Sequence, residues 1–154
     1  MGQIDARLRE LGIDIPEVAT PVANYVPART TGNLLYTAGQ LPFVDGALVA
    51  TGKVGAEVSV NQAVELARIA TLNALAAAQS VLGSLDRITQ VVKVNGFVAS
   101  SPDFIQQPTV LNGASELLGE IFGEIGIHAR AAVGVAVLPL DAPVELELIV
   151  EFSS

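Results

Sequence analysis

The segment "VELELIVEF" at residues 144–152 alternates strictly between apolar and other side chains. Successive side chains of a β-strand point to opposite faces, so one face of this strand is entirely apolar. That face comprises Val144, Leu146, Leu148, Val150 and Phe152, and the other comprises Glu145, Glu147, Ile149 and Glu151. The pattern is typical of an antiparallel sheet with one face buried beneath helices and the other facing water.

The rest of the chain supplies helices and strands for such a sheet. The expected elements are a helix at 3–12, strands at 23–30 and 33–41, a glycine-rich loop with one short strand at 42–58, a helix at 59–82, a strand at 88–100, a helix at 106–123 and strands at 130–138 and 143–152. This order predicts an α+β fold, β-β-α-β-α-β-β, with two helices on one face of a mixed sheet. We expect one domain over residues 1–154, in which residues 1–20 form an N-terminal extension containing the short helix.

Several local signals support these boundaries. Pro27 places the first strand at a sheet edge or a bulge, and "TG" at 31–32 indicates a hairpin turn. Ser59 followed by Gln62 has the spacing of a capping box at the start of a helix. Gly113 weakens its helix by roughly 1 kcal/mol relative to alanine, so we expect another backbone to approach closely there.

Composition excludes several classes of protein. The chain is 51% hydrophobic and only 16% charged, which excludes intrinsic disorder. It has no cysteine and a single histidine, His128, so it has no disulfide, no thiol nucleophile and no histidine metal cluster within one chain. A net charge of −8, with scattered lysines and arginines, argues against nucleic-acid binding.

The chain is expected to be a soluble, cytoplasmic protein that self-associates. No signal peptide is evident, and no apolar run reaches transmembrane length, so we expect no membrane association. The mean hydropathy of +0.52 is high for a soluble domain and favours burial of apolar surface against other chains.

Arg130 is the charged residue that most strongly indicates a binding site. Along its strand the same-side neighbours Ala132, Gly134 and Ala136 are small, which leaves room around the guanidinium. A guanidinium in such surroundings is suited to holding a carboxylate through two parallel hydrogen bonds. The alternative is a structural salt bridge to Glu145 or Glu147, and spacing alone does not separate the two.

Two further positions have more than one interpretation. Gly39 in "YTAGQLP" allows a ligand or a second backbone to come close, or else marks a β-bulge. His128 is typical of a loop or interface histidine rather than of a catalyst. The three glutamates of the closing strand are, taken singly, typical of a solvated sheet face.

Four segments taken in order resemble the Rid/YjgF family of reactive-intermediate deaminases, also called L-PSP endoribonuclease-like proteins. They are "GNLLYTAGQLP" (32–42), "VVKVNGFVAS" (91–100), "NGASELLGEIFG" (112–123) and "ARAAVGVAVLP…VELE" (129–147). The resemblance implies a chorismate-mutase-like fold and a homotrimer with ligand clefts between subunits. It also implies hydrolysis of 2-imino acids such as 2-aminoacrylate to 2-keto acids and ammonia, without a cofactor or a metal.

The resemblance also assigns roles to individual residues. Arg130 matches the arginine that grips the substrate carboxylate, and Glu145 matches the acid that orients or activates water. The other matching positions are Tyr25, which lines the cleft, Gly39, whose backbone faces the ligand, Asn112 on the second helix, and Ala132, where the family often has cysteine.

The chain also departs from the family pattern. Ala38 stands where many deaminases carry serine, the 43–58 loop is longer, and the N-terminal extension is unusual. These departures indicate a divergent subgroup and leave a second function open, a non-catalytic trimer that binds small carboxylates such as 2-keto acids. The endoribonuclease function in the family's older name is disfavoured by the net charge of −8.

Overall fold

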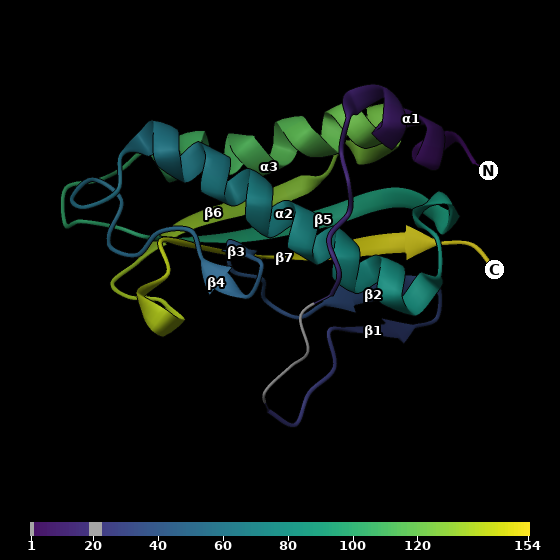
Figure 1. Cartoon of the computed structure of the whole chain (residues 1–154), viewed down its shortest axis with the longest axis horizontal. Helices are drawn as coiled ribbons and strands as arrows, with labels where there is room; N and C mark the ends of the chain where they lie inside the picture. The colour runs from purple at the N-terminus through teal and green to yellow at the C-terminus, as the bar shows by residue number, and fades with distance from the viewer. Residues whose placement is uncertain (1, 19–22) are drawn as a thin grey trace.

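A five-stranded mixed sheet carries two long helices on one face (Figure 1). The computed structural model describes residues 2–18 and 23–154, so residues 1, 19 and 20 of the expected N-terminal extension lie outside the described residues. The sheet strands are β1 (Ala28–Thr31), β2 (Leu34–Thr37), β5 (Ile88–Ala99), β6 (Ala129–Val135) and β7 (Val144–Phe152). The helices are α1 (Gln3–Leu11), α2 (Val60–Leu82) and α3 (Gln107–Phe122), with short 3₁₀ turns at Leu85–Arg87, Gly123–Gly126 and Pro139–Asp141.

The strand order is β1-β2-β7-β5-β6, which puts the alternating strand β7 in the centre. β5 and β6 run parallel, and the other neighbours pair antiparallel. β1 is an edge strand, as Pro27 predicts, but it begins at Ala28 and not at residue 23 as expected, because proline has no backbone N–H for strand pairing. The turn at Gly32 has a positive φ of 57°. β6 forms the other edge, so its outer backbone groups are not paired within the sheet.

The core lies between the helices and the apolar face of the sheet. Val144, Leu146, Leu148 and Val150 are fully buried, whereas Glu145, Glu147 and Glu151 on the opposite face are half-buried. The remaining core is mainly aliphatic side chains from α2, α3 and β5, including Leu66, Ala70, Ala74, Leu75, Val91, Val94, Val98, Leu111, Leu117 and Leu118. The two faces predicted from the alternation of β7 are therefore confirmed.

The helices begin and meet as the sequence predicts. The Ser59 side chain accepts a hydrogen bond of 3.2 Å from the Gln62 backbone N–H and caps α2. A Cβ at Gly113 would collide with the carbonyl oxygen of Val64 on α2, which is the close backbone approach expected at that glycine.

The 42–58 segment differs from the prediction. It contains two short strands, β3 (Phe43–Val44) and β4 (Ala47–Leu48), which pair as a separate hairpin. Asp45 and Gly46 form its turn with φ angles of 51° and 82°. Asp-Gly is a strong signal for a tight hairpin turn, and this signal could have identified the second strand.

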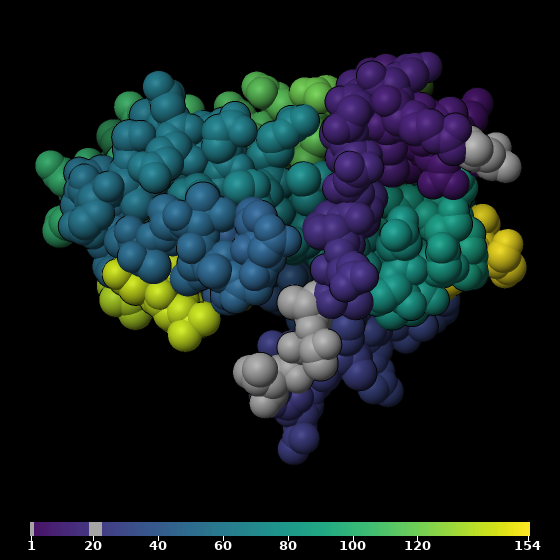
Figure 2. Space-filling view, viewed as in Figure 1, coloured from purple at the N-terminus to yellow at the C-terminus, as the bar shows by residue number. Residues whose placement is uncertain are grey.

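The N-terminal segment lies across the helical layer (Figure 2). Residues 15–18 line a shallow surface depression together with Ala76, Gln79, Ser80 and Gly83 at the end of α2. On α1, the Arg7 Nε donates a 2.8 Å hydrogen bond to the Glu120 carbonyl oxygen of α3. The segment is thus packed against both long helices.

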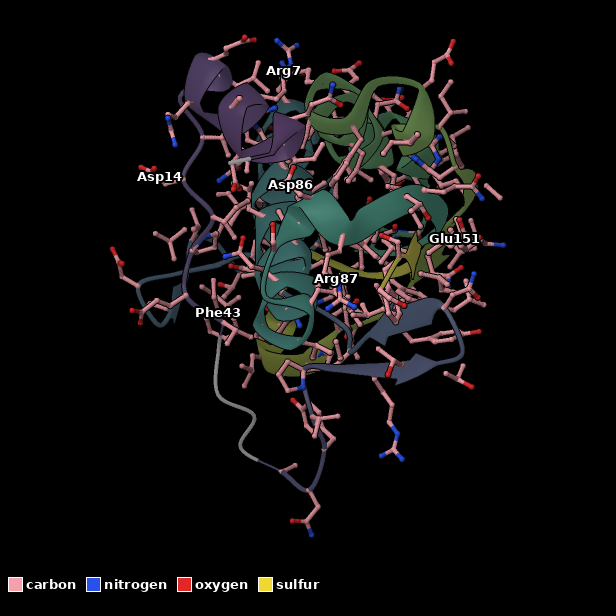
Figure 3. All side chains as sticks on the ribbon, turned by 90° about the vertical axis from the view of Figure 1, so that its right-hand side faces the viewer. Arg7, Asp14, Phe43, Asp86, Arg87 and Glu151 are labelled. Atoms are coloured by element: carbon pink, nitrogen blue, oxygen red, sulfur yellow. The ribbon has the colours of Figure 1, made fainter. Side chains whose placement is uncertain are left out.

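The carboxylate of Asp86 caps α1 from a distant part of the chain (Figure 3). The N-cap residue Gly2 has no side chain, and Asp86 Oδ1 accepts a 2.7 Å hydrogen bond from the Ile4 backbone N–H. A Cβ at Gly2 would collide with the same carboxylate. Because backbone N–H groups at a helix start have no partner within the helix, a carboxylate placed there stabilises it.

Asp86→Ala is therefore expected to loosen α1 from the domain. Loss of a helix cap costs about 1 kcal/mol, so thermal unfolding should begin at a lower temperature and proteolysis of the N-terminal segment should be faster. Asp14→Ala is the matched control, since Asp14 is exposed. Equal proteolysis rates in the two variants would contradict a capping role for Asp86.

Candidate functional site

The guanidinium of Arg130 lies at the edge of the sheet, against α3. Its Nη1 donates one hydrogen bond of 2.9 Å to Asn112 Oδ1 and another of 3.1 Å to Ser115 Oγ. Asn112 and Ser115 are three residues apart, so they lie on one side of α3 and face β6 together. Arg130 is half-buried, and its Nε and Nη2 donate no hydrogen bond within the described part of the chain. This free edge has the geometry to receive a carboxylate in two parallel hydrogen bonds.

Strand register places Arg130 and Glu145 on opposite faces of the sheet. Arg130 pairs with Val94, and Val94 pairs with Leu148, whose side chain is buried beneath the helices. Glu145 pairs with Phe97 and belongs to the opposite set of side chains. Directly paired residues point to the same side of a sheet, so the two candidate catalytic residues do not meet within one chain.

The salt-bridge alternative for Arg130 is therefore not realised within the described part of a single chain. Its partners are the neutral groups of Asn112 and Ser115, and neither Glu145 nor Glu147 is among them. The physical reason is the face on which Arg130 lies, which depends on strand order and register and not on spacing along the chain.

Glu145 lies on the open face of the sheet, against Gly39. A Cβ at position 39 would collide with Oε2 of the Glu145 carboxylate, so glycine is required for this contact. Gln40, the next residue, forms an isolated bridge with Leu146 through two backbone hydrogen bonds of 2.8 and 3.0 Å. The sequence predicted a ligand, a second backbone or a β-bulge at Gly39, and within the described residues of one chain the neighbour is instead the side chain of Glu145.

Burial raises the pKa of the Glu145 carboxyl above its ordinary value of 4.5, and the charge of Glu147 raises this pKa further. A carboxyl whose pKa is shifted upward toward neutrality is a better proton acceptor, and when protonated it can return the proton. Desolvation and a like charge are the usual means by which proteins prepare a catalytic acid or base.

The raised pKa predicts a pH-dependent stability. Because the folded-state pKa of Glu145 lies above the unfolded-state pKa, the protonated carboxyl group favours the folded state. This contribution to stability is fully present below pH 4.5 and is lost as the pH rises through the raised folded-state pKa. Glu145→Gln should therefore melt at a higher temperature than wild type at pH 7.5, and the difference should shrink toward pH 4. Glu65→Gln on the exposed side of α2 controls for the loss of one charge. A variant no more stable than wild type at pH 7.5 would contradict this account.

An open surface pocket of about 720 Å³ contains Tyr25 and reaches Ala38, the residue before Gly39. It is lined by Ala23, Asn24, Tyr25, Val26, Arg29, Tyr36 and Ala38. Tyr25 is 54% exposed and Tyr36 is 42% exposed, so both rings are largely uncovered in the single chain. Ala38 joins the pocket to Gly39 and thus to Glu145. Arg29 and Tyr36 were not predicted as site residues, although the β1–β2 register places them as a directly paired couple.

The structure thus sorts the predicted site residues into two groups. Tyr25, Gly39 and Glu145 belong to the open face of the sheet, and Asn112 and Arg130 belong to the edge formed by β6 and α3. Ala132 is on the same side of β6 as Arg130 and packs against the hydrophobic core. The small neighbours of Arg130 are explained in part by packing, since a Cβ at Gly134 would meet the side-chain amide of Gln107 on α3.

His128 is joined to the edge group. Its Nε2 lies 2.8 Å from Ser115 Oγ, and its Nδ1 lies 2.6 Å from the Gly126 carbonyl oxygen. It lies in the connection between α3 and β6, as expected for a loop histidine, and is half-buried. Ser115 was not predicted, and the signal that could have found it is its position three residues after Asn112.

In residues 2–18 and 23–154, no group of three or more His, Cys, Asp or Glu side chains is placed to hold a metal ion. No helix in that part of the chain is long and apolar enough to cross a membrane.

Comparison with known proteins places these features in a family. The model of the YjgF/chorismate mutase-like endoribonuclease family matches residues 5–152. Protein TCP17 of Trypanosoma cruzi is 45% identical over 99% of this chain and 96% of its own length. A 2-iminobutanoate/2-iminopropanoate deaminase of Dermatophagoides farinae is 31% identical over 90% of this chain and 93% of its own length.

The fold is shared with solved structures. The crystal structure of Atu1372 from Agrobacterium tumefaciens superposes with a TM-score of 0.90 at 48% identity, covering 97% of this chain and 92% of that one. The chorismate-mutase-like α+β fold expected from the sequence is therefore confirmed. The extent of the family match and the identity of these relatives show that the chain belongs to the YjgF/chorismate mutase-like family, the Rid family that its sequence resembles.

Proposed function

We propose that the protein is a hydrolytic deaminase of 2-imino acids of the 2-aminoacrylate type, giving 2-keto acids and ammonia. The observation that carries the proposal is the Arg130 guanidinium, with Nη1 held by Asn112 and Ser115 and its Nε–Nη2 edge free in the described chain. A 2-imino acid has a planar carboxylate next to the reactive carbon, which matches this edge. The name of the Dermatophagoides farinae relative supports the same substrate class.

The reaction needs a base for water and an acid for the departing ammonia. 2-Aminoacrylate tautomerises to 2-iminopropanoate, and water then adds to the C=N carbon while Glu145 accepts a proton from it. As the C–O bond forms, the imine nitrogen takes up the proton held by Glu145, which gives a carbinolamine. Glu145 then accepts the proton of the carbinolamine hydroxyl and delivers it to the amino nitrogen; the C–N bond breaks, ammonia leaves and a keto group remains. The raised pKa of Glu145 suits it to both transfers, which typically contribute about 10² to 10⁴-fold to a rate.

We further propose that the working form is a homotrimer with its clefts between neighbouring chains. The opposite placement of Arg130 and Glu145 supports this, because a cleft between chains can join the edge of one sheet to the open face of another. Uncovered apolar side chains on the open face, including Tyr36 and 45%-exposed Val133, also favour association with further copies. No cofactor enters this scheme, since water and one carboxyl group supply the chemistry.

Ammonia release from freshly generated 2-aminoacrylate tests the proposal. Wild type should accelerate release over the spontaneous reaction, and Arg130→Ala should lower kcat/KM by about 100-fold or more, the effect of losing a charged pair of hydrogen bonds. A wild-type rate equal to that of Arg130→Ala would contradict the proposed activity.

A second function is favoured by one specific residue. Ala38 lines the pocket that contains Tyr25 and stands where many deaminases of the family carry serine, so the pocket lacks that hydroxyl. A trimer that binds 2-keto acids without turnover would show Arg130-dependent stabilisation in a thermal-shift panel of carboxylates, together with no catalysed ammonia release.

A further inference from the structure

A continuous chain of hydrogen bonds runs from Arg130 through Ser115 and His128 to the main chain. The successive distances are 3.1 Å from Arg130 Nη1 to Ser115 Oγ, 2.8 Å from Ser115 Oγ to His128 Nε2, and 2.6 Å from His128 Nδ1 to the Gly126 carbonyl oxygen. The first two distances lie in the usual range for hydrogen bonds, and the third is slightly shorter than is usual for N–H···O.

The donors and acceptors of this chain can be assigned from chemistry. The Gly126 carbonyl oxygen can only accept a hydrogen bond, so His128 Nδ1 carries a hydrogen atom and donates this hydrogen bond. In the neutral ring Nε2 is then an acceptor, and the Ser115 hydroxyl donates to it. The Ser115 oxygen keeps lone pairs to accept from Arg130, which can only donate. With a neutral imidazole ring, the donor and acceptor roles are therefore mutually consistent along the whole chain of hydrogen bonds.

This chain of hydrogen bonds ends at a tightly packed turn of the fold. Gly126 is buried, and a Cβ there would collide with the Leu118 carbonyl oxygen of α3, so the turn Gly123–Gly126 is packed tightly against the helix. Ser115 and Asn112 belong to the same helix. Arg130 Nη1 is thus fixed from two directions, while its Nε–Nη2 edge carries no bond in the described residues.

We propose that Ser115 and His128 are positioning residues that orient the Arg130 guanidinium for a planar carboxylate. The inference rests on the proposed function, in which Arg130 binds the carboxylate of the substrate. An arginine side chain has several rotatable bonds, and freezing them on binding costs affinity unless the bound orientation already exists. His128 acts here through Ser115 and Arg130 and does not touch the substrate, because its Nε2 is engaged by Ser115.

The first test measures the mobility of the Arg130 side chain in the absence of a ligand. In the full-length protein, NMR relaxation of the Arg130 Nε–H group reports how ordered the guanidinium is. Ser115→Ala and His128→Leu should both make this group more mobile, and His128→Gln should keep it close to wild type, since an amide oxygen can accept from Ser115 as Nε2 does. Unchanged mobility in both Ser115→Ala and His128→Leu would overturn the positioning role.

The second test measures binding of 2-oxobutanoate by calorimetry. Ser115→Ala should weaken binding by about 10-fold, the usual consequence of losing one hydrogen bond to a charged group. His128→Leu should weaken it by about 3- to 10-fold, and His128→Gln should restore it to within about twofold of wild type. In an Arg130→Lys background neither substitution should add its full effect, because both act through the guanidinium. Full additivity would overturn the inference.

The two tests separate this inference from the proposed function. If wild type and Arg130→Ala bound 2-oxobutanoate equally well, Arg130 would not be the carboxylate-binding residue. The proposed function would then be contradicted, whatever the mobility of Arg130 in the wild-type protein. Arg130-dependent binding that is unaffected by Ser115→Ala and His128→Leu would leave the carboxylate site standing and overturn only the positioning role. Melting temperatures of all variants within a few degrees of wild type confirm that folding is intact.

Discussion

Arg130→Lys is expected to lower kcat/KM for 2-iminopropanoate by about 100-fold, although it keeps the positive charge. A lysine ammonium cannot present two parallel N–H groups, and it cannot hold Asn112 and Ser115 while also offering a free edge. Most of the loss should fall on KM, because the carboxylate is held in the ground state as well as in the transition state. Steady-state kinetics with freshly generated substrate measure both constants.

Arg68→Lys on α2 is the matched control for this substitution. Arg68 lies 3.8 Å from Glu120 in a surface ion pair, so exchanging it for lysine should leave kcat/KM unchanged. If the Arg130→Lys enzyme were as active as this control, a positive charge alone would be sufficient for substrate binding. The proposal that Arg130 holds the carboxylate through two parallel hydrogen bonds would then be contradicted.

Gly113→Ala is expected to have the largest effect on stability. The added Cβ would meet the Val64 carbonyl oxygen of α2, and backbone cannot move aside as a flexible side chain can. Overpacking of this kind costs about 1–3 kcal/mol or more, despite the better helix propensity of alanine. Urea unfolding monitored by circular dichroism measures the change in free energy.

Gly119→Ala in the same helix gives the opposite expectation. Apart from its own helix backbone and chain neighbours, no atom of the described residues lies within 4 Å of the position that its Cβ would take, so only helix propensity changes. The substitution should stabilise the fold by about 1 kcal/mol. If both alanine variants shifted stability in the same direction, the close approach of α3 to α2 at Gly113 would be contradicted.

Much of the fold could be predicted because its signals are local. The alternation of β7 gave the buried and open faces of the sheet, and Ser59 with Gln62 marked the start of α2. Gly113 marked a close backbone approach before its partner, Val64, was known. The second strand of the β3–β4 hairpin was missed, although Asp45 and Gly46 carry a recognised turn signal.

The arrangement of the site depends on long-range order that spacing does not contain. Arg130 faces the helices and Glu145 faces away because β5 lies between β6 and β7 and fixes both registers. The capping of α1 by Asp86 and the contact of Arg130 with Ser115 likewise join segments far apart in the chain. The sequence could therefore suggest candidate residues such as Arg130 and Glu145, but it could not show how they are grouped, and it did not point to Ser115.

We propose that Arg130 of one chain and Glu145 of another form each reactive cleft. Co-refolding equal amounts of Arg130→Ala and Glu145→Gln chains tests it most directly, since each variant alone should be nearly inactive in ammonia release. Half of the chains keep Arg130 and the other half keep Glu145, so random mixing in a trimer leaves about a quarter of the clefts with both native residues. We therefore expect about a quarter of the wild-type rate. A mixture as inactive as the separate variants would contradict the shared cleft.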